Sequence, residues 1–227
     1  MKRFVVIITL CLATAPAAAG SLPTPPDLER AGWSTFSFDN SAPARFIGHE
    51  DGRLEVYTYS STSLLYRDLI SDEPGERLSW RWRVDRATAR TDLSQKGGDD
   101  RSLAVHLWFP ETAGHRPGLF TQIGRGVARA LGAPVPGNSI TYVWGGKHPP
   151  ATMLPNPYFN DGVIIVLESN QAPLKTWRDV SVDWRADFKN AFGYEAPAPS
   201  HIAVSADSDD TGSQSRGFIA DIHLGTD

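Results

Sequence analysis

The stretch RLSWRWRV at residues 77–84 is the strongest indicator of the fold class. Within it Trp80 and Trp82 alternate with Arg81 and Arg83, so one side of the segment is apolar and the other is charged. Successive side chains of a β-strand point to opposite faces, whereas a helix repeats its apolar face every three or four residues. The alternation therefore predicts a strand with one buried face.

The same alternation recurs along the chain in short segments that are separated by glycine, proline and aspartate. These segments lie at residues 33–38, 53–59, 102–109, 139–144, 163–168, 201–206 and 217–224. Many short strands with such turns favour an all-β fold over an α/β fold. We predict a single antiparallel β-sandwich of jelly-roll type over residues 31–227.

Two segments have helical spacing instead. Residues 119–131 place apolar side chains at three- and four-residue intervals and are followed by Gly132. Residues 182–192 carry Trp184, Phe188 and Phe192 four residues apart and are followed by Gly193. Glycine after an amphipathic segment is a common helix end. We expect two short helices on the edge or end of the sandwich.

The N-terminus has the pattern of a secretory signal peptide at residues 1–19. Lys2 and Arg3 precede a short apolar run, and three alanines precede Gly20. The apolar run is shorter than the ~20 residues that span a bilayer. Residues 20–30 are proline-rich and are predicted to form a linker. The protein is thus expected in the periplasm of a bacterium or outside the cell.

Composition excludes several classes of function. Cleavage before Gly20 removes Cys11, the only cysteine, and leaves 20 basic against 26 acidic residues, or about −6. A cysteine-free chain forms no disulfide, and an acidic chain has no broad basic surface for nucleic acid. Phosphate-binding loops, nucleophile elbows and zinc-binding histidine pairs are missing from the sequence. We expect no catalytic cofactor.

The order of several short motifs resembles a known family. The motifs include WRW at residues 80–82, GDD at 98–100, PGNSITYVWG at 136–145, NPY at 156–158 and DSDDT at 207–211. Together they resemble domain-of-unknown-function family 3047, a set of exported bacterial proteins. The resemblance covers most of the chain after residue 30. It implies a β-sandwich and an exported protein, and it implies no particular activity.

An aromatic and polar strip is the first candidate binding site. If Leu107 and its neighbours face the core, His106 and Trp108 project from the opposite face of their strand. An exposed indole beside charged groups suits a sugar ring and its hydroxyls. The full set of expected ligand-binding residues is Arg81, Arg83, Asp100, His106, Trp108, Tyr142 and Trp144. The alternative, that Trp108 and Trp144 are covered or belong to the core, remains open.

An acidic segment is the second candidate site. Asp207 and Asp209 are separated by a serine, and Asp221 follows on the last predicted strand. Closely spaced carboxylates and hydroxyls are the oxygen ligands that Ca²⁺ requires. The same residues are also ordinary turn formers, whose side chains accept backbone N–H bonds. Both a calcium site at Asp207, Asp209 and Asp221 and a metal-free turn remain open.

The sequence supports a non-catalytic envelope module that binds a glycan or another polar ligand. One alternative is a carbohydrate-active enzyme on the same face. A glycoside hydrolase would use two of the carboxyl groups, and a lyase would use His106 or Tyr142 beside Arg83. Another alternative is a structural module that contacts a protein partner. The candidate hydrolase carboxyls are Asp99, Asp100, Glu168, Asp187 and Asp209.

Overall fold

The strand predicted at residues 77–84 is present as the first eight residues of β5 (Arg77–Arg86), and its alternation is confirmed. Trp80 and Trp82 are 2% and 0% exposed, whereas Arg81 faces solvent. The structure is a computed structural model that describes residues 20–38, 41–69, 75–111 and 136–225.

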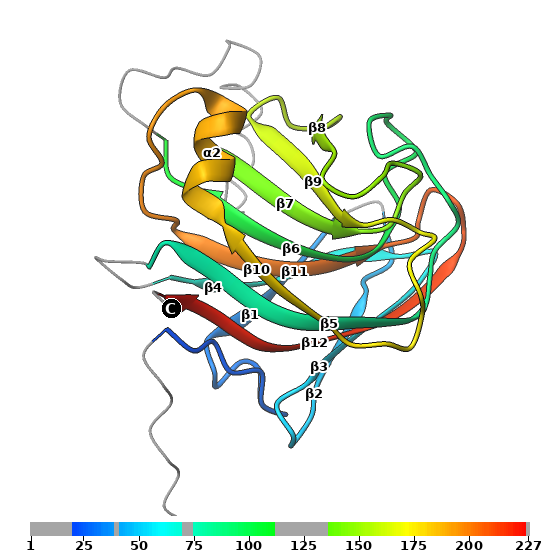
Figure 1. Ribbon diagram of the computed structural model, residues 1–227. Coiled ribbons are helices and arrows are strands. Elements are labelled where there is room, and N and C mark those ends of the chain that lie inside the picture. The colour runs from blue at the N-terminus through cyan, green and yellow to red at the C-terminus, as the bar shows by residue number, and fades with distance from the viewer. Residues whose placement is uncertain (1–19, 39–40, 70–74, 112–135, 226–227) are drawn as a thin grey trace, which may run out of the picture.

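Two sheets form the two layers of the fold (Figure 1). The seven-stranded sheet contains, in spatial order, β1 (Trp33–Ser37), β4 (Thr62–Asp68), β11 (His201–Asp207), β6 (Arg101–Phe109), β7 (Asn138–Trp144), β9 (Gly162–Glu168) and β8 (Met153–Pro155). The five-stranded sheet contains β10 (Arg178–Asp183), β5, β12 (Gln214–Gly225), β3 (Leu54–Tyr59) and β2 (Arg45–Gly48). The all-β class is therefore confirmed.

The sheets are not wholly antiparallel, which corrects the prediction. Strand β9 runs parallel to β7, while the other strand pairs within the described residues are antiparallel. The cause is the short strand β8, which pairs antiparallel with β9. The chain reverses once before β8 and once after it, so β9 returns in the direction of β7.

The core between the sheets is dominated by aromatic side chains from β5 and β7. The rings of Trp80 and Tyr142 lie 5.7 Å apart, and those of Trp82 and Trp144 lie 5.6 Å apart in an edge-to-face arrangement. All four side chains are almost completely buried. Because each indole buries a large apolar area, these contacts stabilise the pairing of the two layers strongly.

The predicted helix at residues 182–192 is present as α2 (Trp184–Phe192). Asp183 caps its N-terminus by accepting a hydrogen bond from the Ala186 amide at 2.9 Å. Gly193 ends it in the left-handed conformation with φ of 79°. Phe188 packs on Phe109 with ring centroids 4.7 Å apart, so α2 closes one end of the core (Figure 1).

The predicted linker at residues 20–30 is only partly a free connection. The Leu22 amide donates to the Ile222 carbonyl at 2.9 Å, and the Leu224 amide donates to the Gly20 carbonyl at 3.0 Å. These bonds add residues 20–22 to the edge of β12. The predicted signal peptide at residues 1–19 and the predicted helix at 119–131 lie outside the described residues. Within the described part, no helix is long and apolar enough to cross a membrane.

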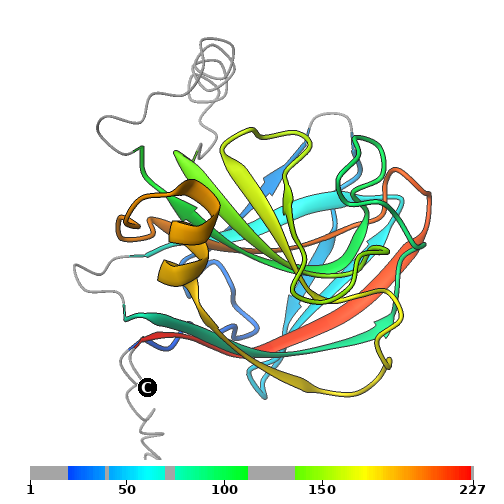
Figure 2. The ribbon, with the colours of Figure 1, turned by 45° about the horizontal axis from the view of Figure 1, so that its top comes forward.

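Two loop regions meet at the end of the sandwich opposite α2. The loop between β5 and β6 and the turn between β11 and β12 both lie there, as the two views in Figures 1 and 2 agree. Strand β6 begins and strand β11 ends at this edge, because they are antiparallel neighbours. This end of the molecule therefore gathers the acidic segments at residues 99–100 and 207–210.

Candidate functional site

The expected ligand-binding residues do not form one site. Arg81 and Arg83 project from the outer face of the five-stranded sheet. The Arg83 guanidinium lies over the rings of Trp177 and Phe218, 5.3 and 4.7 Å from their centroids. His106 and Trp108 instead belong to the outer face of the seven-stranded sheet. The two groups are on opposite sides of the sandwich, so no single ligand can contact both.

Trp144 and Tyr142 face the core, which corrects their expected role as contacts for a ligand. Both are 0% exposed. The Tyr142 hydroxyl donates a hydrogen bond of 2.9 Å to Asp187 on α2. Burial, with Asp187 beside it, raises the pKa of Tyr142 well above its usual value. The hydrogen bond between Tyr142 and Asp187 therefore connects the seven-stranded sheet to α2.

His106 and Trp108 project outward as predicted, but both are only 6% exposed. The Trp108 ring stacks on Tyr66, with centroids 5.9 Å apart. His106 contacts the hydroxyl of Thr141 at 3.1 Å and that of Ser205 at 2.8 Å. Burial and then the charge of the nearby Arg101 lower the pKa of His106 to about 3. His106 is therefore a neutral, hydrogen-bonded side chain at neutral pH.

A cluster of five carboxyl groups lies where β6 begins and β11 ends. We call it the acid cluster, and its members are Asp99, Asp100, Asp207, Asp209 and Asp210. A β-bulge creates its centre. Ser205 pairs with Ala104 and Asp207 pairs with Arg101, so β6 has one residue more than β11 between the two pairs. The extra residue turns the Arg101 side chain onto the face of Asp207.

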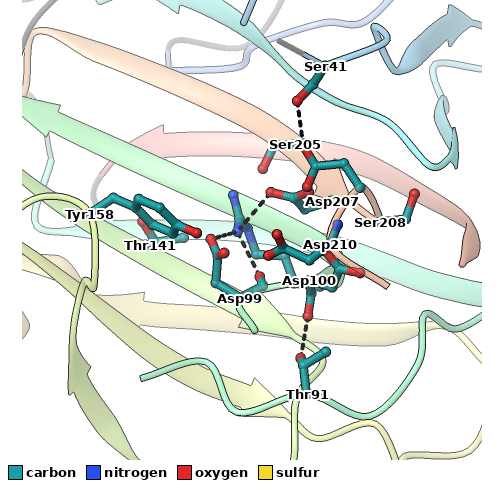
Figure 3. Close-up of polar contacts among 12 residues, drawn as sticks. Ser41, Thr91, Asp99, Asp100, Thr141, Tyr158, Ser205, Asp207, Ser208 and Asp210 are labelled. Atoms are coloured by element: carbon teal, nitrogen blue, oxygen red, sulfur yellow. Dashed lines mark hydrogen bonds and ion pairs between the residues drawn. The ribbon is translucent and has the colours of Figure 1, made fainter. Parts of the chain in front are cut away.

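Arg101 is the cation at the centre of the acid cluster, of which Figure 3 labels Asp99, Asp100, Asp207 and Asp210. Its Nη1 lies 3.0 Å from Asp99 Oδ2 and 3.3 Å from Asp207 Oδ2, and it also donates to the Asp99 carbonyl at 2.9 Å. The side chain is 12% exposed. A nearly buried guanidinium thus holds two acidic side chains together.

Asp100 organises the turn after β11 and is completely buried. Its carboxylate accepts hydrogen bonds from the Asp210 amide at 3.2 Å, from the Thr211 amide at 3.0 Å and from the Thr211 hydroxyl. The Asp100 carbonyl accepts from Thr91 at 2.8 Å, as Figure 3 shows. This carboxylate therefore fixes the position of Asp209 and Asp210 relative to β6.

Asp207 is the most perturbed carboxyl of the acid cluster. It is 7% exposed, and burial raises its pKa to about 8, although Arg101 opposes the rise. The neighbouring charges of Asp209 and Asp99 raise the pKa further. Desolvation and the Asp99 charge also raise the pKa of Asp210 to about 6. Without a bound cation, the acid cluster retains protons near neutral pH.

The loop that precedes the acid cluster is fixed by the Trp-Gly-Gly turn after β7. Gly146 adopts φ of 70°, and a Cβ there would lie 2.5 Å from Leu93 Cγ. Beyond the turn, Lys147 and His148 both contact Asp92, each at 2.8 Å. These hydrogen bonds, Lys147 first, lower the pKa of Asp92. Lys147 and His148 thus hold the loop in place.

Tyr158 lies at the rim of the acid cluster and is 57% exposed. Figure 3 shows its ring beside Asp99. The Tyr158 hydroxyl accepts a hydrogen bond of 2.7 Å from the Gly97 amide, and Lys96 Nζ lies 5.7 Å from the ring centroid. A solvent-exposed aromatic ring therefore stands next to carboxylates that are partly accessible.

Several expected site residues lie elsewhere. Asp221 belongs to β12 in the other sheet, where it is 3.6 Å from Arg81 Nη1, so it does not join Asp207 and Asp209. Glu168 faces Arg178, and Asp187 bonds to Tyr142. The replacement for Asp221 is Asp100: one carboxylate oxygen each of Asp100, Asp207 and Asp209 lie within 4.8 Å of one another.

Sequence reasoning missed Arg101 as a member of this site, and it quoted Tyr158 and Asp210 within motifs without assigning either a role in binding. Arg101 directly follows the quoted Gly-Asp-Asp motif, and Tyr158 ends the quoted Asn-Pro-Tyr motif. The signal that could have identified them was their position within or directly after these motifs. Strict alternation from Leu103 would place Arg101 on the core side of its strand, and the bulge places it on the other side.

Comparison with known proteins identifies a family but no activity. No curated protein matches this chain. One similar solved structure is the xyloglucanase domain of NopAA, a type three effector from Sinorhizobium fredii, in complex with cellobiose. It is 9% identical, the match covers 86% of this chain and 98% of that one, and the TM-score is 0.43. A likeness this distant carries no argument about function. The family model described as "Protein of unknown function (DUF3047)" matches residues 31–223, and the chain therefore belongs to that family.

Proposed function

We propose that this chain is an exported bacterial envelope protein that binds a glycan at the acid cluster without catalysing a reaction. The observation that carries the proposal is Tyr158, whose ring is 57% exposed beside Asp99 and Asp210. The C–H face of a pyranose packs on an aromatic ring, and its hydroxyls donate to carboxylates. Export to the periplasm or beyond, and the jelly-roll type of the sandwich, remain predictions.

The proposed binding position differs from the one expected from the sequence. Trp108 and Trp144 are buried, so neither presents a free ring face to a sugar. Tyr158 takes the place of the indoles as the stacking residue. Arg101 is enclosed by Asp99 and Asp207, so the hydrogen-bonding groups offered to the ligand are mainly acceptors.

The charge of the acid cluster selects among glycans. Five carboxyl groups share one guanidinium, so the rim repels a uronate and accepts a neutral or an amine-bearing sugar. This argues against the lyase alternative, which needs a cation to neutralise a uronate. The residues of that alternative are also separated, because Tyr142 is in the core and Arg83 is on the opposite face.

Binding to neutral and amino polysaccharides tests the proposal. We expect depletion of the purified chain by at least one such polymer, and a loss of affinity of about tenfold or more in Tyr158→Ala, which corresponds to ~1.4 kcal/mol. Tyr59→Ala is the matched control, because Tyr59 is 60% exposed but lies on β3 of the other sheet. Equal losses in both variants, or no binding to any polymer, would overturn the proposal and favour a protein-contacting module.

A glycoside hydrolase is the second candidate, and one observation favours it. The pKa of Asp207 is raised to about 8, as a general acid at neutral pH requires, and one oxygen of Asp209 lies within 4.8 Å of one oxygen of Asp207, so a second carboxyl is at hand. Release of new reducing ends from a bound polymer, abolished in Asp207→Asn, would establish catalysis. Binding without products would exclude it for the polymers tested.

A further inference from the structure

We propose that Asp100, Asp207 and Asp209 hold a calcium ion at the end of the sandwich opposite α2. The site would place the ion between the end of β11 and the residue before β6. One oxygen from each of the three carboxylates lies within 4.8 Å of the others. This inference goes beyond the proposed glycan binding and does not depend on it.

The balance of charge around the three carboxylates calls for a cation. Arg101 is the guanidinium of the acid cluster, and it contacts Asp99 as well as Asp207. Of the other basic side chains near this surface, Lys96 lies over the Tyr158 ring, and Lys147 and His148 are bonded to Asp92. Buried carboxylates persist in folded proteins when they are paired or when they coordinate a metal. A divalent cation would neutralise the negative charge of the carboxylates that the single Arg101 guanidinium leaves unbalanced.

A second observation points to a ligand between Asp207 and Asp209. Asp207 is 7% exposed, and its Oδ1 is buried and has no hydrogen-bond donor among the described residues. Its other oxygen, Oδ2, is the one that faces Arg101 at 3.3 Å. One oxygen of Asp207 lies within 4.8 Å of an oxygen of Asp209 and of Asp100, so the buried Oδ1 without a donor belongs to a side chain of the same cluster. Carboxylates are acceptors only, so a proton or a cation must lie between them.

The donor set selects calcium among the common metal ions. All three side chains offer carboxylate oxygens, whereas zinc and copper prefer histidine and cysteine. Calcium accepts six to eight oxygens in an irregular arrangement, as loops provide them. The spacing of Asp207, Asp209 and Gly212, the last at φ of 64°, resembles the first half of an EF-hand loop, with Thr211 in place of its third acidic or amide residue. Asp100 adds a ligand from a different part of the chain.

A bound ion would have a consequence for the hydrolase candidate. With calcium between them, Asp207 has no proton to donate and Asp209 is not free to attack a sugar. Calcium binding and Asp207-dependent hydrolysis therefore exclude each other, whereas glycan contact with Tyr158 and Asp210 is compatible with either.

Thermal unfolding of the purified full chain in CaCl₂ and in chelator tests the site. We expect calcium at about a hundred times its dissociation constant to raise the unfolding midpoint by about 5–10 °C. Asp209→Asn should lose most of this response. Asp221→Asn is the matched control, because Asp221 was a candidate ligand in the sequence but lies in the other sheet, and it should keep the full response.

Terbium luminescence in the same variants provides a readout that does not depend on stability. Terbium replaces calcium in oxygen sites, and we expect saturable emission that calcium displaces in the wild type and in Asp221→Asn. Asp209→Asn should bind at least tenfold more weakly, and Asp207→Asn, if it folds, should show the same loss. An unchanged midpoint and no displaceable emission in the wild type would overturn the proposal and leave a shared proton between the carboxyls. An undiminished response in Asp209→Asn would overturn the placement. Glycan binding has its own readout, so the two proposals can fail separately.

Discussion

Charged side chains are arranged differently on the outer faces of the two sheets. On the five-stranded sheet, several arginines have an acidic partner: Arg53 pairs with Asp51 and Arg216 with Glu55, both at 2.7 Å, and Arg81 pairs with Asp179 at 2.9 Å. At the end of the seven-stranded sheet, five carboxyl groups gather near one buried guanidinium, that of Arg101, which contacts two of them. The first face is balanced at the surface, and the second concentrates negative charge in a partly buried place.

The difference separates a structural surface from a candidate binding site. Paired, exposed charges stabilise a fold weakly and leave nothing for a ligand to neutralise. Like charges held close together destabilise the free protein, and they persist when the surrounding structure or a ligand compensates them. Four substitutions test whether the two faces differ in this way, and they are given in order of decreasing expected effect.

Replacing Arg101 by methionine should have the largest effect. The substitution leaves Asp99 and Asp207 buried without their cation, and breaking a buried ion pair typically costs about 3–5 kcal/mol. We expect a loss of unfolding free energy of this size in urea denaturation at pH 9, where Asp207 is ionised, and a smaller loss at pH 7, where Asp207 carries a proton. A loss below about 1 kcal/mol would show that the acid cluster does not depend on Arg101.

Replacing His106 by glutamine should change how stability depends on pH. The pKa of His106 is about 3 in the folded chain and about 6.5 when unfolded, so the unfolded state binds more protons between these values. The stability of the wild type is therefore fully present above pH 6.5 and falls as the pH drops, by up to about 1.4 kcal/mol per unit from this residue. Glutamine removes that contribution. Urea unfolding from pH 7 to pH 4 should show a shallower fall in the variant, and parallel curves would contradict the buried neutral state.

Replacing Phe218 by leucine tests whether the five-stranded face is held by its aromatic ring. Three guanidiniums lie over this ring, those of Arg83, Arg216 and Arg53, at 4.7, 5.2 and 5.6 Å from its centroid. Leucine keeps the apolar volume approximately but removes the cation–π attraction, so we expect a loss of about 1–2 kcal/mol. Glycan and calcium binding should be unchanged. A loss of either would show that the two faces are coupled.

Replacing Arg81 by methionine should have the smallest effect. Its side chain is 46% exposed and its partner Asp179 is 83% exposed. Exposed pairs contribute less than about 1 kcal/mol and are screened by salt. We expect the small difference from wild type in urea unfolding to vanish in 1 M NaCl. A difference as large as that of Arg101→Met would remove the contrast between the two faces.

The strands could be predicted from the sequence because alternation is a local property. Trp80 and Trp82 lie inward where the pattern placed them, and the helix that contains Phe188 ends at the predicted glycine. The parallel pairing of β7 and β9 could not be predicted, because the three-residue strand β8 is too short to give a periodic signal.

The candidate site was predicted in part. Asp100, Asp207 and Asp209 were recognised as separate acidic segments, and the structure brings them together. Trp144 and Arg83 were assigned to the same ligand although one lies in the core and the other on the far face. Residue type indicates what a side chain can contact, but it does not indicate which face of which sheet will carry it.

The sequence by itself determined the all-β class, the helix before Gly193 and the membership in a family of unknown function, and its single cysteine leaves no disulfide within the chain. Each of these depends on local periodicity, on composition or on the order of motifs. Only the tertiary structure decided that Arg101 turns toward Asp207, that Asp221 lies apart and that Tyr158 borders the carboxyls. Those relations depend on strand order and on one β-bulge, which are set by packing between residues distant in the chain.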